Sequence, residues 1–395
     1  METGDLSELV ITAVAVPPLP HDGRSQDGRS HDGTSDGGIS DGGWGANAAG
    51  TGSFSDFRQS HALREAHELE KWGNLDRCTT EPESVEYWRG SEYEERALFL
   101  ARLGQETVGT CSVTLPLREN TGTAGIDVLV APGYRRRGWG RRLLEHAEAV
   151  ARDRGRTSLD AYFELPAELV ERAGPLLPAK SGAGGLPEED PSVAFAAGAG
   201  YELEQVERSS RLALPVPSGH LSALEAEAAA QARGYLPVGW ADSCPAEFVD
   251  GYAVLKRRMS TDVPVAGMDW EAEDWDVGRV RHEEETLMRS GVQTVVAAAV
   301  QRSTGELVAY TVLNWRPGVP EAIIQQDTLV SAEHRGRRLG TLVKVANLRA
   351  AQRRWPGARS VLTWNASENQ HMLAINISLG FRPDGYEGEW QKRLG

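Results

Sequence analysis

The chain has 395 residues, which is too long for one ordinary domain and sufficient for two domains of about 150–200 residues each. Hydrophobic residues make up 40% of the chain and charged residues 25%, as in soluble globular proteins. The net charge of −15 and the pI of about 5.2 argue against nucleic-acid binding, and no stretch is apolar and long enough to predict a membrane span.

The cysteines and the first residues bear on the cellular compartment. Cys78, Cys111 and Cys244 are far apart and show no CxxC spacing, which argues against a disulfide framework and against a zinc site. The apolar run near residue 10 follows three acidic residues and no basic one, so it predicts a buried strand and not a signal peptide. We therefore expect a cytoplasmic protein without a bound metal.

The segment that follows has low complexity. From His21 to Gly43 it repeats a degenerate five-residue unit, HDGRS-QDGRS-HDGTS-DGGIS, with almost no apolar residue. Such a segment cannot bury enough apolar surface to offset its ordering entropy. We predict a disordered insertion over about 20–53 and favour a tolerated insertion over a metal- or partner-binding role.

The first half then continues with regular elements. A helix is predicted over 54–72, and alternating strands over 97–117 turn at Gly104-Gln105. A strand over 125–132 leads through a basic glycine loop into an amphipathic helix over 138–154. Further strand, loop and helical segments reach residue 214, and a linker carrying a short helix is expected over 215–234.

The second half repeats this order. Strand and helical segments reach Met288, and strands over 292–301 and 306–315 form a hairpin. A strand over 322–330, a basic loop and a helix ending at Trp355-Pro356 follow, and then a strand, a helix over 369–381 and a final strand. We expect an N-terminal domain over 1–214, the linker, and a C-terminal domain over 235–395.

An internal repeat supports this division. Residues 126–144, IDVLVAPGYRRRGWGRRLL, align without a gap with residues 326–344, QDTLVSAEHRGRRLGTLVK. Six positions are identical: Asp127/Asp327, Leu129/Leu329, Val130/Val330, Arg135/Arg335, Arg137/Arg337 and Gly140/Gly340. Six identities in 19 positions, centred on the loop, indicate a duplicated unit.

The repeated unit is a phosphate-binding design. The unpaired N–H groups at a helix start and the helix dipole favour an anion, glycine permits close backbone approach, and arginine adds charge-assisted contacts. The loop lacks the Lys-Ser/Thr of a P-loop and is not a GxGxxG motif.

The segment VAPGYRRRGWG resembles the V-x-P-x-x-[RQ]-x-x-G-x-[GA] signature of the GNAT acetyltransferases. The resemblance implies an α/β fold in which each copy has a central, mostly antiparallel twisted sheet flanked by helices, and a loop that binds the pyrophosphate of acetyl-CoA. The second copy matches at Arg335 and Gly340 but has Arg338 in place of the first glycine, and it ends in SLGF with Asn365 and Asn369 upstream. The tandem layout is similar to that of actinobacterial double-GNAT proteins of the mycothiol synthase type.

The resemblance also implies which residues contact the cofactor. In the second copy these are Leu329, Val330, Arg335, Gly336, Arg337, Arg338, Leu339, Gly340, Thr341, Asn365 and Asn369. In the first copy they are Leu129, Val130, Arg135, Arg136, Arg137, Gly138, Trp139, Gly140 and Arg141.

In the family an amine attacks the thioester directly, and a backbone N–H near Leu329-Val330, or Leu129-Val130, would bind the developing oxyanion. Asp327 is our first candidate for the general base, against a structural role for it and Asp127, and Glu368 is a further candidate. The family often has a tyrosine acid where this chain has Asn376 and, in the first copy, Ala196. Asn376 is a candidate for binding the cofactor or the substrate, but it cannot act as an acid at neutral pH. The acid is then Tyr386 or His371, or the thiolate leaves unprotonated.

We expect an acetyl-CoA-dependent N-acetyltransferase acting on a small-molecule amine, with the second copy catalytic because Asn365, Asn369 and Asn376 follow its loop. The alternative is a non-catalytic acyl-CoA-binding sensor or scaffold, which the absent tyrosine favours. A monomer and a homodimer are both compatible with the sequence, and neither nucleic acid nor membrane is an expected partner.

Overall fold

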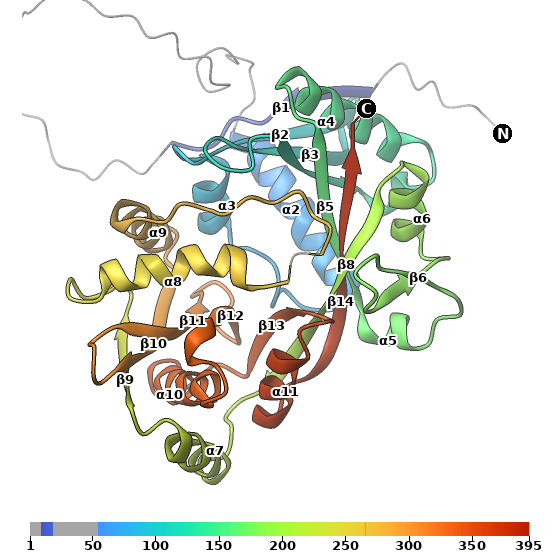
Figure 1. The fold of residues 1–395 in the computed structure, drawn as a ribbon. Helices are drawn as coiled ribbons and strands as arrows, with labels where there is room; N and C mark the ends of the chain where they lie inside the picture. The colour runs from blue at the N-terminus through green and yellow to red at the C-terminus, as the bar shows by residue number, and fades with distance from the viewer. Residues whose placement is uncertain (1–8, 19–53, 265, 395) are drawn as a thin grey trace, which may run out of the picture.

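A computed structural model describes residues 9–18, 54–264 and 266–394 of the chain (Figure 1). The low-complexity segment, predicted to be disordered over about 20–53, lies outside the described residues. Within these residues, no helix combines the length and the apolar character needed to cross a membrane.

The first half contains two helices ahead of its main strands and a helix between β4 and β5. Its elements are β1 (Leu9–Ala13), α2 (Phe54–Trp72), α3 (Glu81–Trp88), β2 (Glu94–Leu103), β3 (Glu106–Pro116), β4 (Thr123–Val130), η2 (Pro132–Tyr134), α4 (Trp139–Asp153), β5 (Ser158–Pro166), α5 (Ala167–Glu171), β6 (Leu176–Pro178), β7 (Gly185–Pro187), α6 (Pro191–Gly198) and β8 (Glu202–Ala213).

The second half follows the same order. Its elements are α7 (Ser218–Gln231), β9 (Tyr235–Ala241), α8 (Val249–Asp262), α9 (Val277–Arg289), β10 (Gln293–Gln301), β11 (Leu307–Trp315), β12 (Ala322–Val330), η3 (Ala332–His334), α10 (Leu339–Arg354), β13 (Ser360–Ala366), α11 (Gln370–Leu379) and β14 (Arg382–Arg393). The expected elements are confirmed, including the helix at 54–72 and the strand–loop–helix unit in each half. The strand predicted near residue 10 is β1, but it is an edge strand with exposed residues and not the buried strand that was expected. The helix expected in the linker is α7, which packs on α10.

The main strands form one continuous sheet of 12 strands, in the order β1-β2-β3-β4-β5-β14-β8-β13-β12-β11-β10-β9. It is mostly antiparallel, and the parallel pairs are β4–β5 and β12–β13. The expected fold class is thus confirmed. The last strand of each half pairs with a strand of the other half: β14 pairs with β5, and β8 pairs with β13. The boundary at residue 214 therefore divides the sequence repeats, whereas the sheet is continuous across it.

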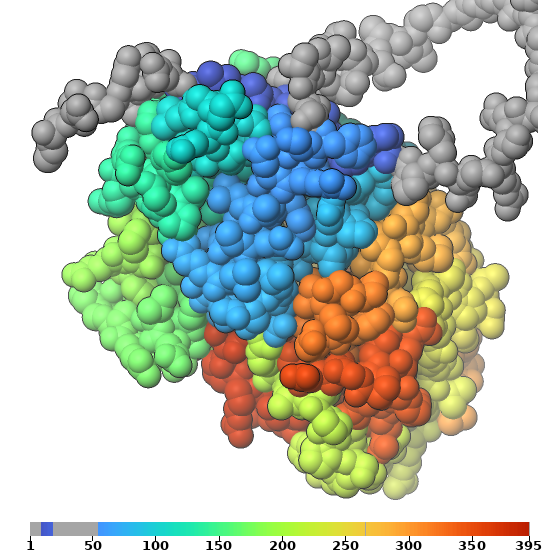
Figure 2. Space-filling view, turned by 180° about the vertical axis from the view of Figure 1, so that it is seen from behind, coloured from blue at the N-terminus to red at the C-terminus, as the bar shows by residue number. Residues whose placement is uncertain are grey.

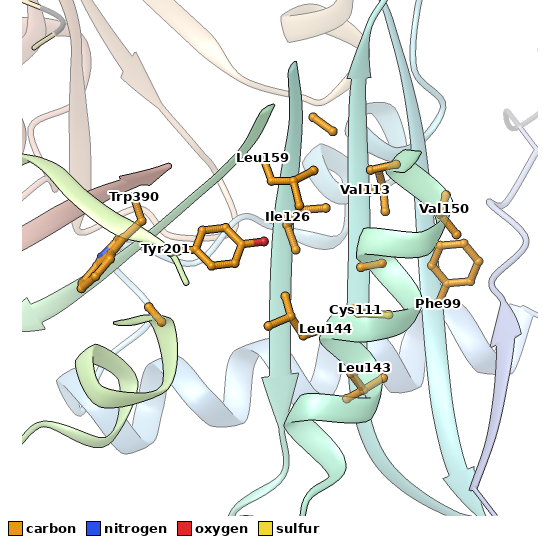
Figure 3. Close-up of a cluster of buried hydrophobic side chains, with 14 of the residues drawn as sticks. Phe99, Cys111, Val113, Ile126, Leu143, Leu144, Val150, Leu159, Tyr201 and Trp390 are labelled. Atoms are coloured by element: carbon orange, nitrogen blue, oxygen red, sulfur yellow. The ribbon is translucent and has the colours of Figure 1, made fainter. Parts of the chain in front are cut away.

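This strand exchange is stabilised by burial. Trp390 of β14 is fully buried and belongs to the core of the first half, together with Leu144, Leu159 and Tyr201 (Figure 3). Burying an aromatic side chain of this size contributes a few kcal/mol. Figure 1 shows β14 and β8 side by side at the centre of the molecule, between the two halves.

Arg77, in the segment between α2 and α3, makes a second set of contacts that joins the two halves. Its Nε donates to Glu164 of β5 at 3.0 Å, and its Nη2 donates to Asp384 of β14 at 2.7 Å and to Ser209 of β8 at 3.3 Å. The guanidinium lies 3.6 Å from the centroid of the Trp72 ring. The view from behind shows this blue segment packed directly against the orange and red second half (Figure 2).

Helices cover the two faces of the sheet. Because neighbouring residues of a strand point to opposite faces, Ile126 and Asp127 identify the two sides in the first half. Ile126 packs in a core cluster with residues of α4, whereas Asp127 contacts Arg64 of α2. The second half repeats the arrangement, with α10 on the first face and α8 on the second.

The sheet opens at two places. β4 and β5 pair from Thr123 to Gly125, and β12 and β13 pair from Ala322 to Ile324. Beyond these residues the strands of each pair continue without ladder hydrogen bonds to each other. We call these openings the N-terminal fork (β4/β5) and the C-terminal fork (β12/β13).

Candidate active site

The two loops between strand and helix have the same backbone. Positive φ angles occur at the second and fourth loop positions of each copy: 62° at Arg136 and 87° at Gly138, and 77° at Gly336 and 55° at Arg338. Glycine adopts this left-handed region freely, and other residues adopt it at a cost of roughly 1–2 kcal/mol. Each copy therefore places one glycine and one arginine at the two positions. Arg338 keeps the loop conformation that Gly138 has, and its side chain pairs with Glu227 of α7.

Both helices begin with free main-chain donors. Among the described residues, no side chain makes a hydrogen bond at the N-cap of α4 or α10, so their first-turn N–H groups stay open to an anion. Trp139, Leu339 and Thr341, which the resemblance placed at the cofactor, have buried side chains. These residues can therefore contact an anion through their backbone N–H groups, but hardly through their side chains.

The first arginine of each loop is fixed to the end of the preceding strand. Arg135 Nε donates to the Val130 carbonyl at 3.0 Å, and Arg335 Nε donates to the Val330 carbonyl at 3.1 Å. Their remaining nitrogens differ. Arg135 makes a two-pronged ion pair with Glu70 of α2, at 2.9 and 2.6 Å. This hydrogen bond lowers the pKa of Glu70.

Arg335 is less firmly held. Its Nη2 contacts the carboxylate of Asp262 at 3.2 Å through a single oxygen, and the Asp262 carbonyl at 3.5 Å. A bidentate guanidinium–carboxylate pair is the stronger arrangement. A phosphate therefore competes with a weaker internal partner at Arg335 than at Arg135.

The strand end next to each loop presents one backbone N–H to the fork. Ser331 N donates to the Val308 carbonyl, on the β11 side of β12. Since N–H directions alternate along a strand, the Val330 N–H points to the other side, where the ladder with β13 has ended. The Ala131–Val108 bond orients the Val130 N–H in the same way. The N–H groups of Val130 and Val330 thus occupy the position expected for an oxyanion donor.

The paired aspartates each contact a cation from the helix above them. Asp127 pairs with Arg64 of α2, and Asp327 pairs with Lys256 of α8 at 3.3 Å. Asp327 also accepts the Tyr310 phenol at 3.0 Å. Burial lowers the pKa of Lys256, but the charges of Glu283 and Asp327 more than reverse this effect and raise it. The Asp327 carboxylate is thus already engaged by an ammonium and a phenol, and its role as general base stays a prediction.

These cations reveal a second level of the repeat that the sequence analysis missed. On α2, Arg64 and Glu70 are six residues apart, and on α8, Lys256 and Asp262 have the same spacing. In each helix the cation pairs with the strand aspartate, and the acid pairs with the first loop arginine. The sequence contained this repeat only as matching charges 192 residues apart, because the paired residues are not identical.

The C-terminal fork contains buried amides. Asn376 of α11 is fully buried, and its Nδ2 donates to Asn365 of β13 at 2.6 Å. Its Oδ1 has no hydrogen-bond partner among the described residues. A buried polar atom without a partner is costly, which indicates a missing donor. Asn369 caps α11, because its Oδ1 accepts a hydrogen bond from Met372 N at 3.2 Å, and its contact with the cofactor stays a prediction.

The same fork contains a buried lysine that the sequence analysis did not single out. Lys344 of α10 occupies the position of Leu144 in the first copy, and its Nζ donates to Gln325 at 3.2 Å. Burial lowers its pKa to about 7. The position was hidden because long charged side chains on a helix usually reach solvent.

Three further candidates were Tyr386, Glu368 and His371. Tyr386 is on β14, within the sheet of the first half, and its hydroxyl donates to Glu171 at 3.4 Å. Glu368 accepts from Gln205 of β8 at 2.6 Å. His371 is exposed on the first turn of α11.

A row of carboxylates crosses the centre of the sheet between the two forks. The register places Glu164 of β5, Glu387 of β14 and Glu207 of β8 opposite one another, on the face covered by α2. Carboxylate oxygens of Glu207, Glu387 and Glu389 lie within 4.8 Å of one another, and all three side chains are partly exposed. We call these four residues the acidic row.

Burial and mutual repulsion favour the protonated forms. Burial, together with the charges of Glu368 and Glu164, raises the pKa of Glu207 to about 7. Burial, Glu207 and Asp160 raise the pKa of Glu389 to about 8. The pKa of Glu387 is also raised, chiefly by burial, against an opposing effect of Lys71.

These shifts predict a pH-dependent stability. Because an unfolded glutamate titrates near 4.5, the folded protein binds more protons between about pH 5 and 8, and stability is lost as the pH rises through 7 to 8. We expect urea unfolding of a Glu207→Gln/Glu389→Gln variant to lack most of this decline, which should be on the order of 1–3 kcal/mol. An unchanged slope between pH 5 and 8 would contradict the raised pKa values, and Glu168→Gln, at an exposed site, is the control.

The comparisons with known proteins agree with this geometry. Residues 63–167 match the acetyltransferase (GNAT) family model. The chain is similar to the tandem GNAT protein from the clavulanic acid biosynthesis pathway, with 27% identity and a TM-score of 0.66 over 86% of this chain and 95% of that one. The match to the family model covers the first copy, and the similarity to the tandem GNAT protein extends over both copies. No curated protein matches the chain.

Two further solved structures share the fold of this chain. The GCN5-related N-acetyltransferase from Sphaerobacter thermophilus has a TM-score of 0.55 at 14% identity, covering 86% of this chain and 93% of that one. A GCN5-related glucosamine N-acetyltransferase region of a fungal multi-domain β-N-acetylglucosaminidase has the same TM-score and identity, over 85% of this chain and 37% of that one. The matched family is one of acetyltransferases, which use acetyl-CoA.

Proposed function

We propose that this protein transfers the acetyl group of acetyl-CoA to a primary amine, and that the C-terminal copy carries out the transfer. One observation carries the choice of copy: the C-terminal fork contains the buried amide of Asn376, whose Oδ1 lacks a donor among the described residues, whereas the N-terminal fork has Ala196 at that position. The pantetheine arm of CoA carries amide N–H groups that fit such an acceptor.

The residues at the C-terminal fork fit the cosubstrate. The open N–H groups at the start of α10 and the lightly held Arg335 would bind the pyrophosphate. The helix approaches α11 closely, since a Cβ atom added at Gly340 would lie 3.0 Å from Ile375 Cδ1. Acetyl-CoA would supply an activated thioester carbonyl, and the Val330 N–H faces the space in which its oxygen would develop charge.

The acceptor side is the acidic row. It lies on the face opposite α4 and α10, between the ends of β5 and β13, which border the two forks. Carboxylates attract an alkylammonium, and Glu207, with its pKa raised to about 7, can accept its proton near neutral pH. A cationic, small-molecule amine is therefore the proposed acceptor class.

The N-terminal copy is proposed as a binding or supporting domain. Arg135 is held by Glu70 through two hydrogen bonds, and Leu144 and Ala196 are apolar where the C-terminal fork has Lys344 and Asn376. An acetyl-CoA held there would have fewer polar partners along its arm.

The test is transfer to a panel of amines. The wild-type protein would be incubated with acetyl-CoA and with mono-, di- and polyamines, and the released thiol and the acetylated products would be measured. We expect turnover with cationic amines, reduced at least about tenfold in Asn376→Leu, which removes one buried hydrogen bond to the fork. Ala196→Leu, at the matching position of the first copy, should leave turnover largely unchanged. Binding of acetyl-CoA without any turnover would instead support a sensor or scaffold.

A further inference from the structure

A cavity of about 390 Å³ lies beside the loop of the C-terminal copy. The end of α7, the start of β9, the turn between β10 and β11, and the loop before α10 contribute to it. Three arginines line it, Arg233, Arg302 and Arg337, together with Tyr235 and uncharged residues, and no carboxylate is among the lining residues. We call it the arginine pocket. It is a locally basic site on a protein with a net charge of −15.

The arginines of the pocket have no carboxylate partner within the described part of the chain. Arg337 Nη1 donates to the Tyr235 hydroxyl at 2.7 Å and to the Glu333 carbonyl at 3.1 Å. Arg302 Nε donates to the Tyr235 carbonyl at 3.3 Å. These contacts orient two guanidinium groups around a buried tyrosine without neutralising them. The neighbours of Arg337 in the loop differ, because Arg335 and Arg338 pair with Asp262 and Glu227.

The first copy does not repeat this arrangement. Its corresponding turn has two residues between β2 and β3, whereas the turn between β10 and β11 has five and so brings Arg302 and Ser303 to the pocket. At the same edge of the first copy, the Tyr134 hydroxyl donates to the carboxylate of Glu106. The basic pocket is therefore a property of the C-terminal copy and not of the shared fold.

We infer that the arginine pocket binds a phosphomonoester group. Guanidinium groups form charge-assisted, often bidentate hydrogen bonds with phosphate oxygens, and an uncompensated set of them favours a dianion over a carboxylate. Arg337 belongs both to the loop and to the pocket, so a phosphate in the pocket lies next to any pyrophosphate at the start of α10. The 3′-phosphate of CoA has this chemistry, and a separate phosphorylated ligand has it too. The first source rests on the proposed function.

The test compares CoA with dephospho-CoA, which lacks the 3′-phosphate. Calorimetric titrations of the full-length protein are expected to show at least about tenfold tighter binding of CoA. In an Arg233→Gln/Arg302→Gln variant, CoA affinity should fall to that of dephospho-CoA, whose own affinity should not change. Arg353→Gln, an exposed arginine at the other end of α10, is the control and should keep the preference.

A second titration distinguishes the sources. Phenyl phosphate would be added to protein saturated with dephospho-CoA, or to protein alone if no CoA binds. Equal affinity for CoA and dephospho-CoA, with phenyl phosphate binding that the double variant loses, assigns the pocket to a separate phosphorylated ligand. If CoA and dephospho-CoA bind equally and phenyl phosphate does not depend on the two arginines, the inference is overturned while the proposed function stands. If phenyl phosphate binds through the two arginines and CoA does not bind at all, the proposed function fails while the inference stands.

Discussion

Replacing Arg335 with glutamate is expected to weaken acetyl-CoA binding at the C-terminal copy by at least about 100-fold. The substitution removes a guanidinium contact to the pyrophosphate, worth about 1.5–3 kcal/mol, and places a negative charge beside it. It also removes the bond from Arg335 Nε to the Val330 carbonyl, which fixes the loop to the strand end. Isothermal titration of acetyl-CoA into the purified variant measures the effect.

The first copy offers the matched comparison. Arg135→Glu changes the same residue type at the same loop position, where the arginine is already neutralised by Glu70. We expect it to remove at most one weaker binding event and to leave turnover within about threefold of the wild type. Loss of binding and turnover in Arg135→Glu alone would assign the chemistry to the N-terminal copy. Loss in neither variant would separate the loops from acetyl-CoA altogether.

The second large effect is expected at Arg77. Arg77→Met should lower the free energy of unfolding by about 3–5 kcal/mol, because it leaves the buried carboxylate of Glu164 without its cation. The side chain is 5% exposed, and its partner Glu164 is 8% exposed. Urea unfolding followed by tryptophan fluorescence provides the measurement, and Trp72, which stacks on the guanidinium, is one of the reporters.

Arg58 is the control for this substitution. Its ion pair with Glu81 lies at the surface, with side chains 71% and 47% exposed, so Arg58→Ala should cost less than about 1 kcal/mol. A cost at Arg77 as small as that at Arg58 would contradict the role of Arg77 in joining β5, β8 and β14. Two separate unfolding transitions are not expected in either variant, because one sheet joins both halves and should unfold as one unit.

Much of the fold could be predicted because it is encoded locally. The strand–loop–helix unit has a periodicity, a glycine pattern and a duplicated sequence that all agree, and the structure confirms it in both halves. The conformation of Arg338 was left open, since a non-glycine residue at positive φ is a matter of local energy that tertiary contacts can override.

The strand exchange was not predictable from the pattern of either strand. The burial along β8 and β14 does not follow a strict alternation, and neither pattern specifies which half the strand pairs with. The choice depends on long-range packing, such as the burial of Trp390 among residues of the first half. The acidic row was missed for the same reason, because Glu164, Glu207 and Glu387 are adjacent only after the exchange.

The site residues likewise divide into those that a local motif predicts and those that depend on long-range packing. Loop positions such as Arg335 follow from the motif, whereas the partners of Asp327 come from a helix whose match to the first copy lies in charge and not in identity. Asn376 was expected near the cofactor from its place before the SLGF segment, and its burial and hydrogen bond to Asn365 are compatible with that prediction.

The exchange of β8 and β14 also constrains the order of synthesis. β5 and β8 leave the ribosome with the first half, but the strand that lies between them is made after every other strand of the sheet. Until then both strands present unpaired edges, which invite pairing with other chains. The sheet of the first half can therefore be completed only after the second half has been made. A nascent chain that ends before β14 would lack a central strand of the sheet and would expose the unpaired edges of β5 and β8.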